Sequence, residues 1–186
     1  FIDRPGYAPG NHFGLRGQWV AGTQKNAYQV DSGAANGAVI EITWSTSVEY
    51  HIAANADDTH CSSGSNYVGN SNMNFPYNSD AERRPFLRWS LGIPAGVTIQ
   101  SATLSVLAYS AGDANPTTIR LWAVDYDSCP SFSTNPFNWP MMAGSNVDWL
   151  LPASFVGGTW YTSPDISRLV QAFIDRPGYA PGNYLG

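Results

Sequence analysis

An eleven-residue sequence occurs twice in this chain of 186 residues. Residues 1–11 read FIDRPGYAPGN, and residues 173–183 repeat the same letters, which sets a period of 172 residues. Eleven identities in register do not arise by chance, and self-similarity at a fixed period is the signature of repeat architectures. We therefore expect one unit of a tandem array or continuous polymer, together with the start of the next unit.

A helix is predicted over residues 164–175, where the second copy begins. Ser163-Pro164-Asp165 is a typical helix start, because a hydroxyl cap, a proline in the first turn and an acid all favour the N-terminal end. An apolar stripe with helical spacing follows, made of Ile166, Leu169, Val170 and Phe173. The first copy begins on the last turn of the same helix, and one turn is not stable alone because nucleation is costly. We therefore expect this chain to be cut through a folded unit.

The remaining segments predict β-strands, because apolar residues alternate with polar ones. The clearest strand is 38–44, in which Ile40, Ile42 and Trp44 share one face. Similar alternation marks residues 13–20, 48–58, 85–91, 99–109 and 118–124. Short turn signals separate several of these strands, and long irregular segments are expected at 62–82 and 127–150. The expected fold is an all-β antiparallel sandwich, jelly-roll-like, with one short α-helix.

Two segments resemble a known family. Residues 84–104 read RPFLRWSLGIPAGVTIQSATL, and residues 165–173 read DISRLVQAF. Both are similar to the DNRLRE-type (disaggregatase-related) β-sandwich modules of exported bacterial and archaeal proteins, which have a strand leading into IPAG and a helix containing LVQ. Residues 13–19 and 39–43 look like the last strands of such modules. The resemblance implies a sandwich that begins near Val48 and ends near Trp44 of the following copy.

This order of parts implies a division of the chain. The expected linker is 45–47, the small polar sequence STS. Residues 48–186 would form the main body, and residues 1–44 would supply strands that complete the sandwich of the preceding repeat. The side chains expected at this contact between repeats are those of Phe1, Ile2, Phe13, Leu15, Trp19, Ile40, Ile42 and Trp44. The alternative is a self-closed unit, in which residues 1–44 fold onto residues 48–186 of the same chain.

The chain has two cysteines, Cys61 and Cys129, and neither has the spacing of a metal site. In an exported protein the simplest interpretation is a disulfide between them, which would stabilise the fold by about 4 kcal/mol on the chain-entropy model. The alternative is two buried free thiols.

The carboxylates form no pattern typical of a catalytic site. Asp57 and Asp58 are neighbours on a predicted strand, so they face opposite sides and cannot act on one substrate. We therefore expect no enzyme activity. Asp57, Asp125 and Asp127 could offer oxygen ligands to Ca²⁺. Turn chemistry explains these acids as well, so no cofactor is expected and Ca²⁺ stays as the alternative.

Composition restricts the partners of the chain. Only 12% of the residues are charged, the net charge is −5, and Lys25 is the one lysine. Nucleic acid is therefore not an expected partner. No apolar stretch reaches membrane-spanning length. The abundance of Gly, Ser, Thr, Asn and aromatic residues is typical of an all-β surface protein, so an extracellular or cell-surface location is expected.

Aromatic residues support two hypotheses about function. Trp139, Trp149 and Trp160 lie in loop-rich sequence, where exposed rings could stack on the faces of sugars, although most tryptophans of a sandwich belong to its core. The expected function is a structural repeat unit of an extracellular filament, stalk or cell-surface fibre, which assembles head-to-tail with copies of itself. The alternative is a carbohydrate-binding module of an exported multidomain protein, with a polysaccharide as its partner.

Overall fold

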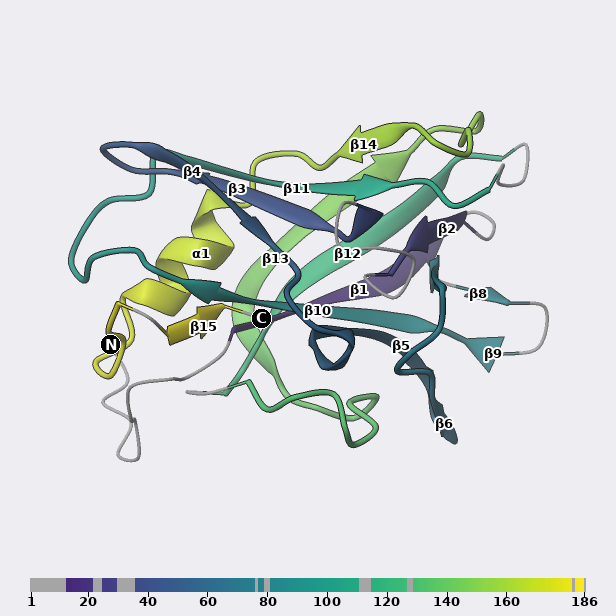
Figure 1. Cartoon of the computed structure of the whole chain (residues 1–186), viewed down its shortest axis with the longest axis horizontal. Coiled ribbons are helices and arrows are strands. Elements are labelled where there is room, and N and C mark those ends of the chain that lie inside the picture. Colours follow the sequence, from purple (N-terminus) through teal and green to yellow (C-terminus); the bar gives the residue numbers. More distant parts are fainter. Residues whose placement is uncertain are drawn as a thin grey trace.

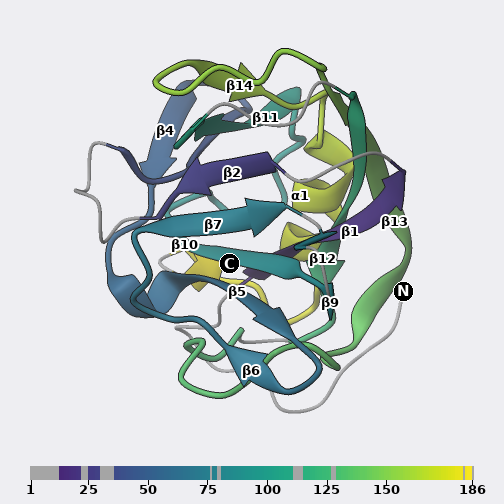
Figure 2. The same ribbon diagram turned by 90° about the vertical axis from the view of Figure 1, so that its right-hand side faces the viewer.

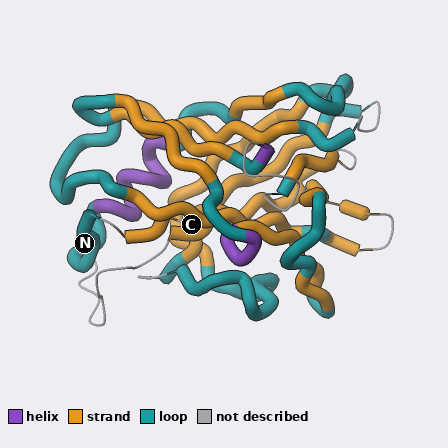
Figure 3. The backbone as a smooth tube through the Cα atoms, in the orientation of Figure 1, coloured by secondary structure: helices purple, strands orange, loops and turns teal. Residues whose placement is uncertain are grey.

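The computed structural model describes residues 13–21, 25–29, 36–75, 77–78, 81–110, 115–126, 129–181 and 183–185. Within these ranges the chain is built mainly of antiparallel strands with one α-helix (Figure 3). The predicted all-β sandwich with one short helix is therefore confirmed. Phe1, Ile2 and Asp127 lie outside the described residues.

One layer of the sandwich is a seven-stranded sheet in the order β13, β12, β1, β10, β5 and β6, with β15 also paired to β10. Every pairing in it is antiparallel. Its strands are β1 (Phe13–Ala21), β5 (Asp58–Ser62), β6 (Ser65–Asn66), β10 (Arg84–Leu91), β12 (Thr117–Val124), β13 (Met141–Leu151) and β15 (Asn183–Leu185).

The other layer is a four-stranded sheet, and two short ribbons accompany the layers. The four strands in order are β14 (Trp160–Thr162), β11 (Ser101–Leu107), β3 (Val39–Thr43) and β4 (Ser47–His51). One ribbon pairs β2 (Lys25–Tyr28) with β7 (Asn72–Phe75), and the other pairs β8 (Tyr77–Asn78) with β9 (Ala81–Glu82). A 3₁₀ turn, η3 (Asn55–Asp57), precedes β5.

The main core fills the space between the two sheets, because every second side chain of a strand faces inward. On β11 these residues are Ala102, Leu104 and Val106, and on β10 they are Leu87, Trp89 and Leu91. The helix α1 (Ser167–Ile174) closes one end of this space (Figure 1) and adds Leu169, Val170, Phe173 and Ile174 to the core. Figure 2 shows the same layers turned by 90°, with α1 between them.

A second apolar cluster lies on the opposite face of β10. Phe86 points away from the main core because it alternates with Leu87 and Trp89 along the strand. We call the set that surrounds it the outer cluster, and it consists of Cys61, Phe86, Val124, Cys129 and Phe132. Residues 129–139 supply two of its members and, beside it, the rings of Phe137 and Trp139, so part of the second predicted insert is packed against the sheet.

The structure corrects several predicted boundaries. The irregular segment expected at 127–150 contains β13, whose Val147, Trp149 and Leu151 face the core. The segment expected at 62–82 contains four short strands from β6 to β9. The helix begins at Ser167 and ends at Ile174. Asp165 precedes the helix, and its side chain accepts hydrogen bonds from the backbone N–H groups of Ala102 and Ser167, each at 2.9 Å.

The linker predicted at 45–47 is wrong. β3 and β4 form a hairpin in which Ile42 pairs with Val48 and Thr43 pairs with Ser47. A hairpin whose strands pair up to the turn is one structural element, so it cannot be a boundary between domains. Ser45 and Thr46 therefore supply small polar turn residues, and Ser47 is the first residue of β4, so the sequence STS is not a spacer.

The strands of residues 1–44 pair with strands of the same chain. β1 lies between β10 and β12, and β3 lies between β11 and β4. Ile40 faces Leu104 and Ile42 faces Ala102 across the ladder between β3 and β11, and both isoleucines and Trp44 are buried in the main core. The structure of one chain thus shows the self-closed alternative, and the sharing of strands between copies stays a prediction.

Candidate functional site: the junction and an outer groove

The second copy of the repeated motif is held against the body that precedes it. We call residues 173–185 the junction. Phe173 and Ile174 are buried at the end of α1, and the ring of Tyr179 packs edge-on against that of Phe173, with centroids 5.6 Å apart. The Tyr179 hydroxyl donates to the carbonyl oxygen of Ile93 at 2.6 Å. The turn that follows the helix is therefore fixed by packing and by a hydrogen bond.

Polar contacts add to this hold on the junction. Arg176 Nη2 lies 3.4 Å from Asp125 Oδ1, which ties the turn to the end of β12. The backbone N–H groups of Asp175 and Tyr179 donate to the carbonyl oxygens of Gln171 and Arg176, each at 2.9 Å. The chain that leaves α1 is thus directed along the body rather than away from it.

The junction ends in β15, which joins the seven-stranded sheet through β10. Leu185 faces Trp89, Tyr184 faces Ser90, and Asn183 faces Leu91. Trp89 is also the partner of Phe13 at the start of β1. Because Leu185 lies one period of 172 residues after Phe13, equivalent positions of the two copies pair with the same residue of β10.

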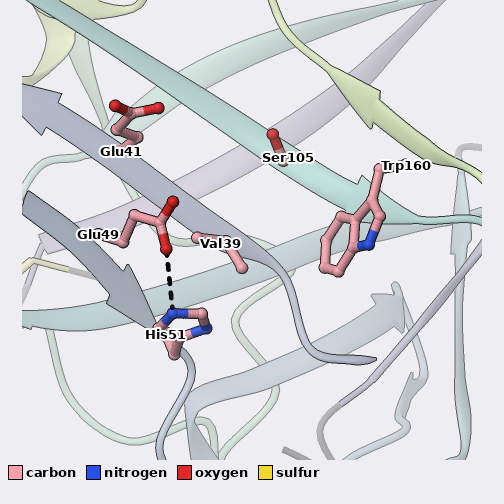
Figure 4. A pocket seen from close by; sticks show the side chains of 6 residues that line it. All are labelled: Val39, Glu41, Glu49, His51, Ser105 and Trp160. Atoms are coloured by element: carbon pink, nitrogen blue, oxygen red, sulfur yellow. Dashed lines mark ion pairs between the residues drawn. The ribbon is translucent and has the colours of Figure 1, made fainter. Parts of the chain in front are cut away.

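A shallow groove of about 260 Å³ lies on the outer face of the four-stranded sheet (Figure 4). It is lined by Val39, Glu41, Glu49, His51, Ser105 and Trp160. Glu49 Oε2 is 3.7 Å from His51 Nε2. Ser47 Oγ donates to Glu41 Oε1 at 2.6 Å, and Trp160 is 44% exposed. The groove combines an aromatic ring with hydrogen-bonding groups, a combination that can bind a sugar.

Of the predicted sugar-stacking tryptophans, the structure places only Trp160 in the groove. Trp149 is 3% exposed because β13 turns it into the main core, so its ring cannot stack on a sugar and that part of the prediction is wrong. Trp139 is half-buried against the outer cluster. Its ring centroid lies 5.8 Å from that of Phe132 and 5.3 Å from that of Tyr126.

The predicted disulfide between Cys61 and Cys129 is not formed. Both thiols are buried and free, and both belong to the outer cluster. Cys61 Sγ donates to the carbonyl oxygen of Arg84 at 3.5 Å, while Cys129 Sγ is directed at the carbonyl oxygen of Pro130, 3.7 Å away. Burial raises the pKa of the Cys61 thiol to about 12 and also raises the pKa of Cys129. The alternative of two buried free thiols therefore describes this chain.

The two described Ca²⁺ candidates are bound by arginines. Asp57 is buried and forms an ion pair with Arg88, and Asp125 is paired with Arg176. Across the described part of the chain, no group of three or more His, Cys, Asp or Glu side chains comes together as a metal site would require. The ion pair of Asp57 attaches η3 to β10. The ion pair of Asp125 attaches the junction to the loop that carries Asp125.

Sequence reasoning missed the acidic part of the groove and a stacked cluster beside β5. Glu41, Glu49 and His51 were detectable, since each alternates with apolar residues of β3 or β4 and so faces outward. The ring of His60 stacks on Tyr67 with centroids 4.6 Å apart, and the Arg83 guanidinium lies 4.5 Å from the centre of the Tyr67 ring. Burial, together with Arg83, lowers the pKa of His60 to about 4. No sequence pattern marked this cluster.

Within the described residues, no helix has the length and apolar character needed to cross a membrane. Comparison of the chain with protein-family models, with curated proteins and with solved structures gave no match.

Proposed function

We propose that the chain is a structural repeat unit of an extracellular filament, stalk or cell-surface fibre, which assembles head-to-tail with copies of itself. The observation that carries this proposal is the anchored junction. A following copy begins inside the motif at 173–183, and this motif is packed on the body through Phe173, Tyr179 and Arg176. A connection of this kind leaves little freedom for neighbouring units to swing, as a fibre requires.

Electron microscopy tests this proposal on the purified chain and on native material. We expect linear particles of regular spacing, whose length increases with protein concentration, because head-to-tail contacts that do not close generate filaments. Tyr179→Ala removes the aromatic contact and the hydrogen bond to Ile93, and is expected to shorten the particles. Tyr109→Ala is the matched control, because Tyr109 is an exposed tyrosine outside the junction. Compact single particles at every concentration, in both kinds of sample, would contradict the proposal.

The groove supports a second candidate function, the binding of carbohydrate. Trp160 offers an exposed ring beside the carboxylates of Glu41 and Glu49 and the hydroxyl of Ser105. The two carboxylates would repel uronic acids, since like charges placed together cost affinity. The groove therefore favours neutral oligosaccharides.

A binding assay with neutral and acidic oligosaccharides tests this second candidate. We expect the neutral set to bind and Trp160→Ala to weaken binding by about tenfold or more, because stacking and area burial by one ring are worth about 1–3 kcal/mol. Tyr109→Ala again serves as the control, because Tyr109 does not line the groove. Equal binding by the parent and Trp160→Ala would rule out the groove as the sugar site.

A further inference from the structure

The groove on the four-stranded sheet has an aromatic side and an acidic side. Residues that pair across neighbouring strands point to the same face of a sheet, and Ser105 of β11 pairs in this way with Val39 of β3. Figure 4 shows Trp160 on one side of these two residues and Glu41 and Glu49 on the other. A ligand that lies across Val39 and Ser105 therefore meets an aromatic ring at one end and carboxylates at the other.

The two carboxylates belong to residues that pair directly with each other. Glu41 of β3 is opposite Glu49 of β4, both side chains are exposed, and like charges in directly opposite positions destabilise a sheet. Ser47 Oγ donates to Oε1 of Glu41 at 2.6 Å, and His51 Nε2 lies 3.7 Å from Oε2 of Glu49. Each carboxylate thus keeps one oxygen to which no described residue is bonded.

A positively charged group complements this pair better than a neutral group does. No lysine or arginine is among the described residues that line the groove, so no side chain of fixed positive charge balances the two carboxylates. The charges that repel a uronic acid attract an ammonium group, because complementary charges favour association. A sugar that carries an amino group in place of one hydroxyl gains this attraction, and its ring can still stack on Trp160.

We propose that the groove binds an oligosaccharide of amino sugars. A protonated, unacetylated amino group lies between Glu41 and Glu49, and another ring of the same ligand stacks on Trp160. This inference rests on the second proposed function, the binding of carbohydrate. Because β11 lies between β14 and β3, two strand spacings of about 10 Å in total separate the ring from the nearer carboxylate strand. One sugar ring does not span both, so the ligand has two or more rings.

Two series of oligosaccharides that differ only in acetylation test the inference. Oligomers of glucosamine carry ammonium groups, whereas oligomers of N-acetylglucosamine have the same rings without charge. Titration calorimetry on the full chain compares them in a mildly acidic buffer, in which amines are protonated and ordinary carboxylates are ionised. We expect the glucosamine oligomers to bind about tenfold more tightly, through exposed charge contacts and a cation–π contact. Added salt is expected to reduce the difference, because it screens exposed charges.

Glu49→Gln is expected to bring the affinity for glucosamine oligomers down towards that for the acetylated series, because the amide keeps the shape of the side chain and loses its charge. Asp175→Asn is the matched control. It changes the net charge by the same amount, at an exposed residue that does not line the groove, and is expected to leave both affinities unchanged. Glu49 is exposed on an edge strand, so its replacement leaves the core intact.

The outcomes separate this inference from the proposed function. Equal binding of the two series by the parent chain would overturn the amino-sugar assignment and leave the binding of neutral carbohydrate standing. Binding of no oligosaccharide would reject the second proposed function, and the inference with it. A lysine oligopeptide of equal charge is the last competitor. If it displaces the glucosamine oligomer at the same concentration as the free oligomer does, the groove recognises charge alone and the assignment to a sugar is wrong.

Discussion

Replacing Asp57 by alanine is expected to lower the free energy of unfolding by about 3–5 kcal/mol, because it leaves the Arg88 guanidinium buried without its carboxylate. The side chains of Arg88 and Asp57 are only 11% and 6% exposed. Arg88 Nη1 also donates to the carbonyl oxygen of Cys129 at 3.1 Å. The substitution therefore weakens the attachment of η3 and of the segment that carries Cys129, and urea denaturation measures the loss.

Asp148→Ala is the matched control for Asp57→Ala. Asp148 forms an ion pair of similar geometry with Arg120, at 2.6 Å, but these side chains are 46% and 36% exposed. Water screens such a pair, so the expected loss is below about 1 kcal/mol. Equal losses for the two variants would show that burial does not decide the strength of these pairs.

Trp149→Ala is expected to destabilise the chain by about 3–5 kcal/mol, because a large side chain is removed from a packed core and a cavity remains. Trp149 faces Ile119 across the ladder between β12 and β13 and belongs to the main core. Thermal and urea unfolding of the purified variant measure the change. A loss of less than 1 kcal/mol would mean that β13 does not bury this ring.

Trp160→Ala is the corresponding tryptophan control. Its ring is partly exposed in the groove, so less apolar area returns to water and the destabilisation is expected to be clearly smaller than for Trp149→Ala. The contrast also matters for the carbohydrate assay. A stable Trp160→Ala variant that loses binding identifies a contact with the sugar rather than a damaged fold.

The sequence by itself determined the class of fold and the apolar faces of its main strands. Alternation at Ile40, Ile42 and Trp44 placed these residues in the core, as the structure confirms, because a strand that buries one face must alternate. The stripe of Ile166, Leu169, Val170 and Phe173 predicted the one helix, since a surface helix buries a stripe of that period. The repeat also established a period of 172 residues, which no structure was needed to see.

Local pattern failed where the outcome depended on distant partners. Three small polar residues suggested a linker at 45–47, but the ladder between β3 and β4 places them in the turn and the first position of a hairpin. Two cysteines suggested a disulfide, but the pairing of β5 with β10 put the Cys61 thiol beside the carbonyl oxygen of Arg84, and the Cys129 thiol lies in a loop beside the carbonyl oxygen of Pro130. Trp149 and Trp160 looked alike in the sequence, and only the register of β13 against β12 buried one of them.

The tertiary structure alone decided how the two copies of the motif relate to the sheet. Identical letters at 1–11 and 173–183 do not say which strand they meet or in which register. Pairing between strands is set by contacts between residues far apart in the chain, and a shift of one residue reverses every side chain. That is why the shared partner, Trp89, became visible only when β1 and β15 were both placed on β10.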